Sequence, residues 1–380
     1  MHSLFYLINM KKILSKFIIA LIFVLTIVLF LIRIKLPINQ NTETCSFFAL
    51  DTNITINVYN HVGNIDLIFD NTKELIKSLE NKLSKTIVYS DIYNINNNND
   101  GDNIEISLDT AFLFALSKDM YDISDQKFDT SIGKLVDYWT KVREEEIKPN
   151  DNDINPLIKT TKHMDYELYY NDGELKSFDV LYDSLLYEND INDYIKHIYE
   201  LKQKDYKYYI KVNNDNQSYD LGAIAKGYIA DYIKYYLSKN GIKSAIINLG
   251  GNVLCIGDKL GKDFNIGIKK PFNENEIIDT VNAKDVSVTT SGIYERYIKF
   301  DNDDTIYHHI IDNTTGYPTN NDLVSATIIT PLSVFGDSIS TICILNGIDE
   351  SSEIIDKIKS KYKIDCNIIY INKNNELIYE

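Results

Sequence analysis

The segment Tyr219-Asp220-Leu221-Gly222-Ala223-Ile224-Ala225-Lys226-Gly227-Tyr228 decides how the rest of the chain is interpreted. Its pattern predicts a strand over 217–221, a turn through Gly222 and a helix that begins near Ile224. Small residues at such a turn let the backbone approach a ligand, and the free N–H groups of a helix's first turn favour an anion. Lys226 adds a positive charge there. The same pattern also fits a plain connection between a strand and a helix, with the aspartate as a cap.

A second group of polar residues consists of two stretches, Thr289-Thr290-Ser291-Gly292-Ile293-Tyr294-Glu295-Arg296 and His308-His309-Ile310-Ile311-Asp312-Asn313-Thr314-Thr315-Gly316-Tyr317-Pro318. Two of the six histidines of the chain are adjacent here. Because neighbouring side chains on a strand face opposite sides, only one of His308 and His309 can line a given pocket. A lone histidine is more often structural than catalytic, so this stretch by itself leaves both roles open.

The third group is Gly336-Asp337-Ser338-Ile339-Ser340-Thr341, which lies in a segment with helical periodicity. Asp337 and Thr341 are four positions apart and therefore share one helix face. Their carboxylate and hydroxyl are hard oxygen ligands that suit Mg²⁺ or Ca²⁺. The pair also fits a structural role, with the aspartate as an N-cap and the threonine packed below it.

Strands and helices alternate irregularly around these groups. Apolar residues at helical spacing predict helices over 65–83, 108–124, 224–237, 334–345 and 351–361, and short alternating segments predict strands at 46–59, 243–249, 324–329 and 366–371, among others. This order indicates an α+β fold rather than a doubly wound sheet. The segment from about 143 to 185 is polar and weakly periodic, and it begins with the charge run Arg143–Lys148. It is predicted to be a surface insertion.

The composition is that of a globular protein, with 44% hydrophobic and 25% charged residues among 380. The formal net charge is −16, and no run rich in Lys or Arg compensates it, so nucleic acid is not expected as a partner. An acidic ligand would need a local positive site, such as a metal or a helix N-terminus.

The N-terminal residues predict a membrane anchor. Residues 17–32 are apolar apart from one threonine, three lysines precede them, and extension to Leu36 gives enough length to span a bilayer. The lysines favour an N-terminus inside the cell membrane and the bulk of the chain on the extracytoplasmic side. We therefore expect residues 1–45 to be signal or anchor and linker, and 46–380 to be one folded domain. Lipidation at Cys45 is disfavoured because no lipobox precedes it.

The cysteines give no metal-binding pattern. Cys45, Cys255, Cys343 and Cys366 form no CxxC pair and no His/Cys ligand spacing, which argues against zinc or an iron–sulfur cluster. Three are expected to be buried thiols and the first to lie near the membrane. If the domain is outside the cell, two of these cysteines could also form a disulfide.

Taken together, the three groups resemble the FAD:protein FMN transferases, also called the ApbE family. The resemblance covers nearly the whole chain from Phe47 onward. The matching segments are Leu50–Thr52, Ser90–Asn96, Lys127–Gly133, Trp139, Asp220–Gly222, Lys226–Gly227, Asn248–Asn252, Thr290–Gly292, His309–Asp312 and Asp337–Thr341. So many matches in the same order make the resemblance specific, although no single one would.

The resemblance implies a single T-fold-related α+β domain with a mixed sheet and flanking helices. It implies a Mg²⁺-dependent transferase that splits FAD, its substrate, releases AMP and attaches FMN through a phosphoester to a Ser or Thr of an acceptor flavoprotein. By position, Mg²⁺ would be held by the Ala223 carbonyl, Asp337 and Thr341. His309 corresponds to the histidine of the family motif and is the candidate general base. The positions that contact FAD in the family are Leu50, Thr86, Lys127, Phe128, Asp129, Asp220, Lys226 and Ile311.

The chain departs from the family pattern at four positions. Leu50 and Asp51 stand where Met and Gly are usual, Asn313 replaces a usual Pro, and Ser340 occupies a position where some members carry a second metal-binding Asp.

Two alternatives to the transferase stay open. The same site and metal would serve an FAD pyrophosphatase that gives FMN and AMP, with water in place of the acceptor hydroxyl. The other is a flavin-binding surface protein without turnover. A purely structural surface protein is disfavoured because the Asp220–Lys226 cluster is intact. If the domain faces outside, acceptors would be exported or membrane-bound flavoproteins, such as electron-transfer subunits.

Overall fold

The computed structural model describes residues 26, 41–61, 63–98, 101–162, 164–188, 190–213 and 216–380. The chain divides into two units, residues 1–41 and 42–380. The predicted anchor lies, apart from Thr26, outside the described residues and stays a prediction from sequence. Within the described ranges, no helix has both the length and the apolar character that crossing a bilayer requires.

One large sheet of eight strands forms the centre of the second unit. Every neighbouring pair in it is antiparallel, so the expectation of a mixed sheet is wrong for this sheet. The pairs at residues 42–59, 245–256 and 367–379 are hairpins, and a tight turn can join only antiparallel strands. In spatial order the strands are β1 (Thr42–Ala49), β2 (Thr52–Tyr59), β7 (Ala245–Leu249), β8 (Asn252–Ile256), β11 (Ser287–Gly292), β14 (Leu323–Thr330), β15 (Asn367–Asn372) and β16 (Leu377–Tyr379).

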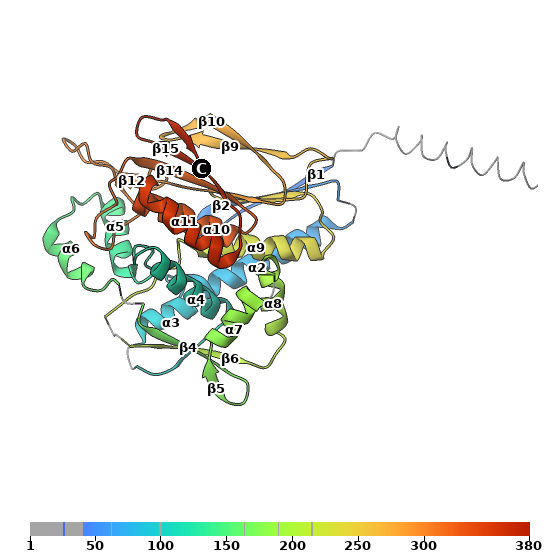
Figure 1. Cartoon of the computed structure of the whole chain (residues 1–380), viewed down its shortest axis with the longest axis horizontal. Helices are drawn as coiled ribbons and strands as arrows, with labels where there is room; N and C mark the ends of the chain where they lie inside the picture. The colour runs from blue at the N-terminus through green and yellow to red at the C-terminus, as the bar shows by residue number, and fades with distance from the viewer. Residues whose placement is uncertain are drawn as a thin grey trace, which may run out of the picture. The chain divides into compact units, whose positions relative to one another are not determined.

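Helices cover one face of this sheet and a hairpin covers the other (Figure 1). The helices that pack on the sheet are α9 (Ala225–Lys239) and α10 (Ser333–Asn346), with α2 (Ile65–Leu83) against α9 and α11 (Ile348–Tyr362) against α10. The hairpin consists of β9 (Phe264–Lys270) and β10 (Asn273–Ala283). The strands buried on both faces are therefore rich in apolar residues, as the pattern of β14 shows.

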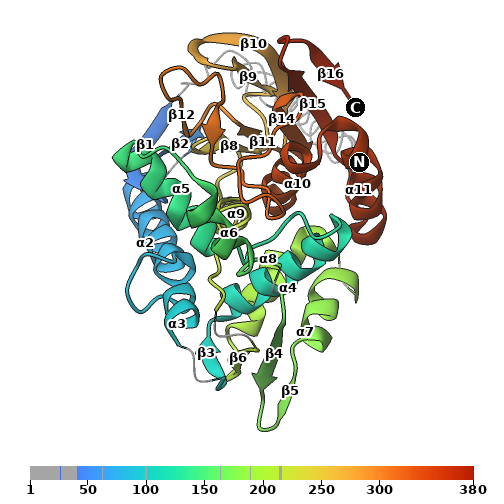
Figure 2. The same ribbon diagram turned by 90° about the vertical axis from the view of Figure 1, so that its left-hand side faces the viewer.

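A smaller antiparallel sheet lies at the other end of the unit, in the order β3 (Ile104–Ile106), β6 (Lys207–Val212), β4 (Tyr166–Asn171) and β5 (Leu175–Ser177). The helices around it are α3 (Asp91–Asn97), α4 (Leu108–Ile123), α7 (Asp179–Asp183), the π-helix Ser184–Glu188, the 3-10 helix Ile191–Asp193 and α8 (Tyr194–Leu201). Figure 2 shows α4 between this sheet and α10.

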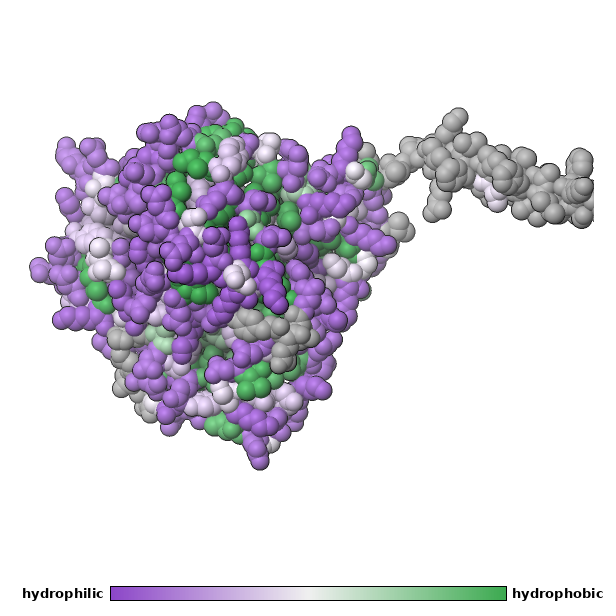
Figure 3. All heavy atoms as spheres, in the orientation of Figure 1, coloured by the Kyte–Doolittle hydropathy of each residue, from purple (hydrophilic) through white to green (hydrophobic). Residues whose placement is uncertain are grey.

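The segment 143–185, expected to be a surface insertion, supplies part of this sheet and of the core. It contains α6 (Asp151–Ile158), β4, β5 and α7, and Tyr166, Phe178 and Tyr182 are buried in the main hydrophobic cluster. Several of its buried side chains are tyrosines, whose hydroxyls make the sequence look more polar while the rings pack like other aromatics. Hydrophilic residues predominate on the face shown in Figure 3, with smaller hydrophobic patches among them.

A buried carboxylate connects the helices that carry the site. Asp109 on α4 accepts hydrogen bonds from Lys82 of α2 at 2.8 Å, from Lys202 at 2.5 Å and from the Tyr228 hydroxyl of α9 at 2.6 Å. Because the charge is paired twice and fully hydrogen-bonded, its burial is tolerated. It fixes the relative positions of α2, α4 and α9.

Candidate active site

The segment before α9 is extended but is not a strand of either sheet. Among the described residues, its only strand-like pairing is the isolated parallel β-bridge between Ser218 and Ile132. The Asp220 amide donates to the Thr130 carbonyl at 2.8 Å, and the Asn96 side chain makes two hydrogen bonds with the Tyr219 backbone. The predicted strand over 217–221 is therefore wrong. Its backbone hydrogen bonds go to separate residues in loops and helices instead of to one neighbouring strand. A periodic sequence pattern does not distinguish these two cases.

Asp220 organises the turn rather than capping the helix. Its Oδ1 accepts the Gly222 amide at 2.7 Å, and its Oδ2 lies 3.3 Å from the ammonium of Lys85. Lys85 also binds Asp137 at 2.6 Å and the Gly133 carbonyl at 3.1 Å. The sequence analysis did not identify Lys85 as a site residue, although it is adjacent to Thr86.

The first turn of α9 donates to Asp337. The Gly227 amide gives its hydrogen to Asp337 Oδ2 at 2.9 Å, so the anion expected at this helix N-terminus is a side chain of α10. Burial raises the pKa of Asp337, and the nearby Lys226 ammonium acts in the opposite direction. Within the described part of the chain, Lys226 forms no ion pair. The carboxylate is thus a buried anion that neighbouring charge only partly compensates.

Two glycines allow this close approach. A Cβ at Gly227 would lie 2.3 Å from the Ser333 carbonyl oxygen, and a Cβ at Gly336 would lie 2.7 Å from Thr289 Oγ1. The Tyr219–Tyr228, Thr289–Arg296 and Gly336–Thr341 stretches therefore meet where α10 packs on both α9 and β11 (Figure 2).

The oxygens here fit a hard divalent cation. Thr341 follows Asp337 by one helical turn, and its hydroxyl donates to the Asp337 carbonyl at 3.2 Å, which leaves its lone pairs available. Ala223 lies in the turn before α9. Ser340 does not join them, because its hydroxyl is buried 2.8 Å from that of Ser291. The described residues contain no cluster of three His, Cys, Asp or Glu side chains, so a metal here would depend on carbonyl, hydroxyl and substrate oxygens.

The two histidines have different surroundings, although only His308 belongs to a strand. They lie at the end of the hairpin formed by β12 (Tyr297–Ile298) and β13 (Tyr307–His308). His308 Nδ1 accepts the Ile310 amide at 3.2 Å, and its Nε2 donates to the Thr319 carbonyl at 2.9 Å. His309 Nδ1 is buried without a partner among the described residues. Burial, followed by the charges of His308, Arg296 and Lys226, lowers the pKa of His309 to about 3.

The predicted FAD-contacting segment 127–129 is mostly engaged within the protein. Phe128 is buried in the main core. The Asp129 carboxylate accepts hydrogen bonds from Ser131, the Lys162 amide at 2.7 Å and the Asn313 side chain at 3.0 Å. Asn313, which stands where the family has Pro, thus supplies a donor to a buried acid. Only Lys127 of this segment has a partly exposed side chain.

The remaining predicted contacts lie at the edges of this region. Leu50 and Asp51 form the β1–β2 turn, each with a φ of 54°, and the Leu50 amide donates to Glu80 at 2.8 Å. Thr86 is exposed and pairs with Ser84. The Ile311 side chain belongs to a separate cluster around Trp139, so only its backbone could contact FAD.

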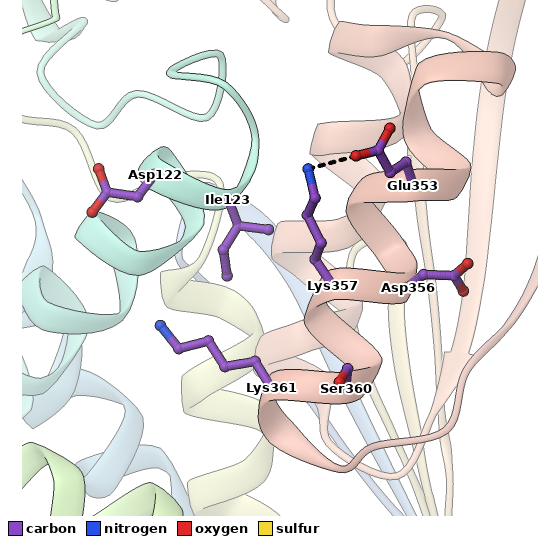
Figure 4. Close-up of a pocket in the computed structure, with 7 residues that line it drawn as sticks. All are labelled: Asp122, Ile123, Glu353, Asp356, Lys357, Ser360 and Lys361. Carbon is purple, nitrogen blue, oxygen red and sulfur yellow. Dashed lines mark ion pairs between the residues drawn. The ribbon is translucent and has the colours of Figure 1, made fainter.

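A shallow groove between α4 and α11 contains none of these residues. Both of its lysines already pair. Lys357 lies 2.9 Å from Glu353 (Figure 4), and Lys361 lies 2.8 Å from Asp119. We therefore assign it no role in the site.

Comparisons with known proteins identify the family of the chain. The ApbE family model matches residues 50–366. An FAD:protein FMN transferase from Klebsiella pneumoniae (strain 342) is 28% identical over 306 residues, which cover 80% of this chain and 82% of that protein. One from Treponema pallidum (strain Nichols) is 38% identical over 146 residues, or 36% of this chain and 40% of that protein.

Solved structures share the fold. The ApbE protein from Thermotoga maritima has a TM-score of 0.68 and 26% identity, covering 89% of this chain and 96% of its own. Flavin transferase ApbE from Vibrio cholerae has a TM-score of 0.69 at 18% identity, covering 90% and 97%, and shows the fold alone. Fold and relatives define a class of transferases. The chain belongs to the ApbE family, as its sequence predicts.

His308→Leu is expected to lower the free energy of unfolding by about 1–3 kcal/mol at pH 7.5, because two backbone groups lose their partner. Burial lowers the pKa of His308 to about 4, below its value of about 6.5 in the unfolded chain. The unfolded state therefore binds a proton that the native state excludes, and this contribution to stability is lost as the pH falls from about 6.5 to 4.

The difference in the free energy of unfolding between the wild type and His308→Leu should therefore be smaller at pH 5 than at pH 7.5. Urea unfolding followed by the fluorescence of Trp139, the single tryptophan, measures it. His197→Leu, at a half-buried position on α8, is the matched control. A difference that did not depend on pH would contradict the role given to His308.

Proposed function

We propose that this chain is an FAD:protein FMN transferase that uses Mg²⁺. The observation that carries the proposal is the buried Asp337 carboxylate at the start of α9, one turn from the Thr341 hydroxyl and beside Lys226, which has no ion-pair partner among the described residues. In such a site, a bound metal would balance the negative charge of the Asp337 carboxylate, and a pyrophosphate would balance the positive charges of the metal and of Lys226.

The proposed metal ligands are Asp337, Thr341 and the Ala223 carbonyl. Bound Mg²⁺ would polarise the pyrophosphate and offset the charge that builds on its oxygens. Lys226 binds the same oxygens as a fixed point charge. FAD is proposed to contact Leu50, Thr86, the 127–129 segment, Asp220 and Ile311 as well, although the buried Phe128 and Asp129 side chains leave mainly backbone atoms for this purpose.

His309 is the proposed general base. Its low pKa keeps the imidazole neutral and able to accept a proton at physiological pH, and an anionic substrate alongside raises that pKa towards the usual range. The imidazole takes the proton of an acceptor Ser or Thr hydroxyl while that oxygen bonds to the FMN phosphorus. The bond from this phosphorus to the bridging oxygen breaks, and AMP leaves with the electron pair.

The test mixes the full chain with FAD, Mg²⁺ and an acceptor flavoprotein that has a Ser/Thr target. We expect an FMN-sized mass increase of the acceptor, in-gel fluorescence and one AMP per adduct, all abolished by EDTA. Release of FMN and AMP without an adduct, with several acceptors, would favour the pyrophosphatase. Bound, intact FAD would overturn the proposal. Location at the membrane, with exported or membrane-bound acceptors, is proposed from the sequence of residues 17–32 only.

A further inference from the structure

Arginine is rare in this chain and is concentrated near His309. The sequence has 39 Lys and Arg residues, of which only Arg33, Arg143 and Arg296 are arginines. Arg143 begins the charge run that the sequence analysis noted, and Arg296 ends the Thr289–Arg296 stretch. Neither belongs to the positions that the family resemblance assigns to FAD or Mg²⁺.

The β12–β13 hairpin brings Arg296 near His309. Tyr297 pairs with His308 and Ile298 with Tyr307. Arg296 directly precedes β12 and His309 directly follows β13, so both lie at the same end of this hairpin, and their charges interact. The side chain of Arg296 is exposed.

Helix α5 (Gly133–Glu145) brings Arg143 to the same hairpin. Trp139 of this helix stacks on Tyr307 of β13, with 5.6 Å between ring centroids and 19° between planes. Arg143 follows Trp139 by four positions and therefore shares its helix face. Figure 2 shows α5 next to β12, and apolar residues of both pack in one cluster.

Two nitrogens of this group are buried without a partner. Arg143 Nη2 donates to Thr140 at 3.1 Å, but Nη1 has no hydrogen-bond acceptor among the described residues, and His309 Nδ1 has none either. Within the same residues, no carboxylate pairs with Arg143 or Arg296. Burial and then the charge of Arg296 lower the pKa of Arg143, as expected of cations brought together without an anion. Leaving such donors unpaired is costly unless a ligand supplies the acceptor.

We propose that Arg143 and Arg296 form an oxyanion subsite beside His309 that binds a phosphate of the dinucleotide. The identity of the ligand rests on the proposed function. A guanidinium offers a planar pair of donors that matches two phosphate oxygens, which a lysine cannot reproduce. Lys226 and the arginines all act electrostatically on His309, so the phosphates of FAD would meet positive charge from α9, α5 and the hairpin together.

The experiment measures equilibrium binding by calorimetry without acceptor or turnover. The probes are AMP and FMN, and adenosine and riboflavin are their phosphate-free controls. For Arg143→Gln and Arg296→Gln, we expect the affinity for AMP, FMN or both to fall about 10- to 100-fold, the range for a lost charge-assisted hydrogen bond. Binding of adenosine and riboflavin should stay within about twofold. Arg143→Lys should restore only part of the loss.

Lys141→Gln is the matched control, because Lys141 lies on the same helix with a side chain that is 63% exposed. It should leave all four affinities unchanged. Unchanged AMP and FMN affinities in both arginine variants would overturn the subsite, as would an equal loss in the Lys141 variant. Arg296 is exposed, so its variant tests the proposal even if the Arg143 variant does not fold. Since binding needs no chemistry, a failed transfer assay with intact arginine dependence would overturn the proposed function alone.

Discussion

Asp337→Asn is expected to abolish metal-dependent transfer, with a loss of about 100-fold or more, because a metal contributes several kcal/mol to such a transition state. The same change should leave the metal-free fold at least as stable as the wild type at pH 7.5. The amide oxygen can still accept the Gly227 amide, whereas the cost of burying a charge disappears. Transfer assays, urea unfolding and the shift of Tm with Mg²⁺ measure these effects, and the Mg²⁺ shift should vanish.

Asp231→Asn is the matched control at a second buried carboxylate. Asp231 on α9 accepts the Ser333 amide at 2.8 Å and the Val334 amide at 3.0 Å, so it caps α10 from outside. Its replacement should cost about 1–3 kcal/mol of stability and keep the Mg²⁺-induced shift. Undiminished metal-dependent transfer by Asp337→Asn would rule out the assigned metal site.

Gly227→Ala is expected to destabilise the protein by about 2–4 kcal/mol, a large effect for one methyl group. The added Cβ would lie 2.3 Å from the Ser333 carbonyl oxygen and 2.7 Å from Val334 Cα, both backbone atoms that cannot rotate away. Separating α9 from α10 would also lengthen the hydrogen bond between the Gly227 amide and Asp337. We therefore expect weaker Mg²⁺ binding in whatever fraction folds.

Gly241→Asn provides the comparison, because a Cβ there meets nothing within 4 Å and its φ of +83° suits asparagine better than other side chains. It should change the free energy of unfolding by no more than about 1 kcal/mol. If Gly227→Ala unfolded at the same urea concentration as the wild type, the helices would not be held as closely as the structure has them.

Much of the fold follows from local sequence patterns. The helix over 224–237 is observed as Ala225–Lys239 and the one over 334–345 as Ser333–Asn346, since long apolar periodicity defines a helix well. The pairing of strands is not local, so the antiparallel order of the large sheet was not recognised. The role of segment 143–185 was missed because its apolar core residues are scattered among polar ones, and the burial of its tyrosines depends on partners in β6 and α4.

In the candidate site, too, local sequence patterns identified single residues but not how they pack together. Sequence patterns marked Asp337, Lys226 and His309 individually, because glycines and polar residues interrupt apolar segments there. That Asp337 meets the start of α9 depends on the crossing of two helices more than a hundred positions apart. Lys85 and Arg143 were not recognised as part of the site, because an isolated basic residue gives no periodic signal. Only packing brings them to Asp220 and to the histidine hairpin.

All four cysteines are buried and unpaired in the structure. Burial raises the pKa of Cys255 and of Cys343 to about 12, so little thiolate forms near neutrality. The native protein should therefore be inert to alkylating agents and behave alike in reducing and oxidising surroundings. A thiol introduced on the exposed rim of the site, for example by Thr86→Cys, would be the one reactive group in the molecule. Cross-linkers or spectroscopic labels attached there could trap an acceptor protein without background from the native cysteines.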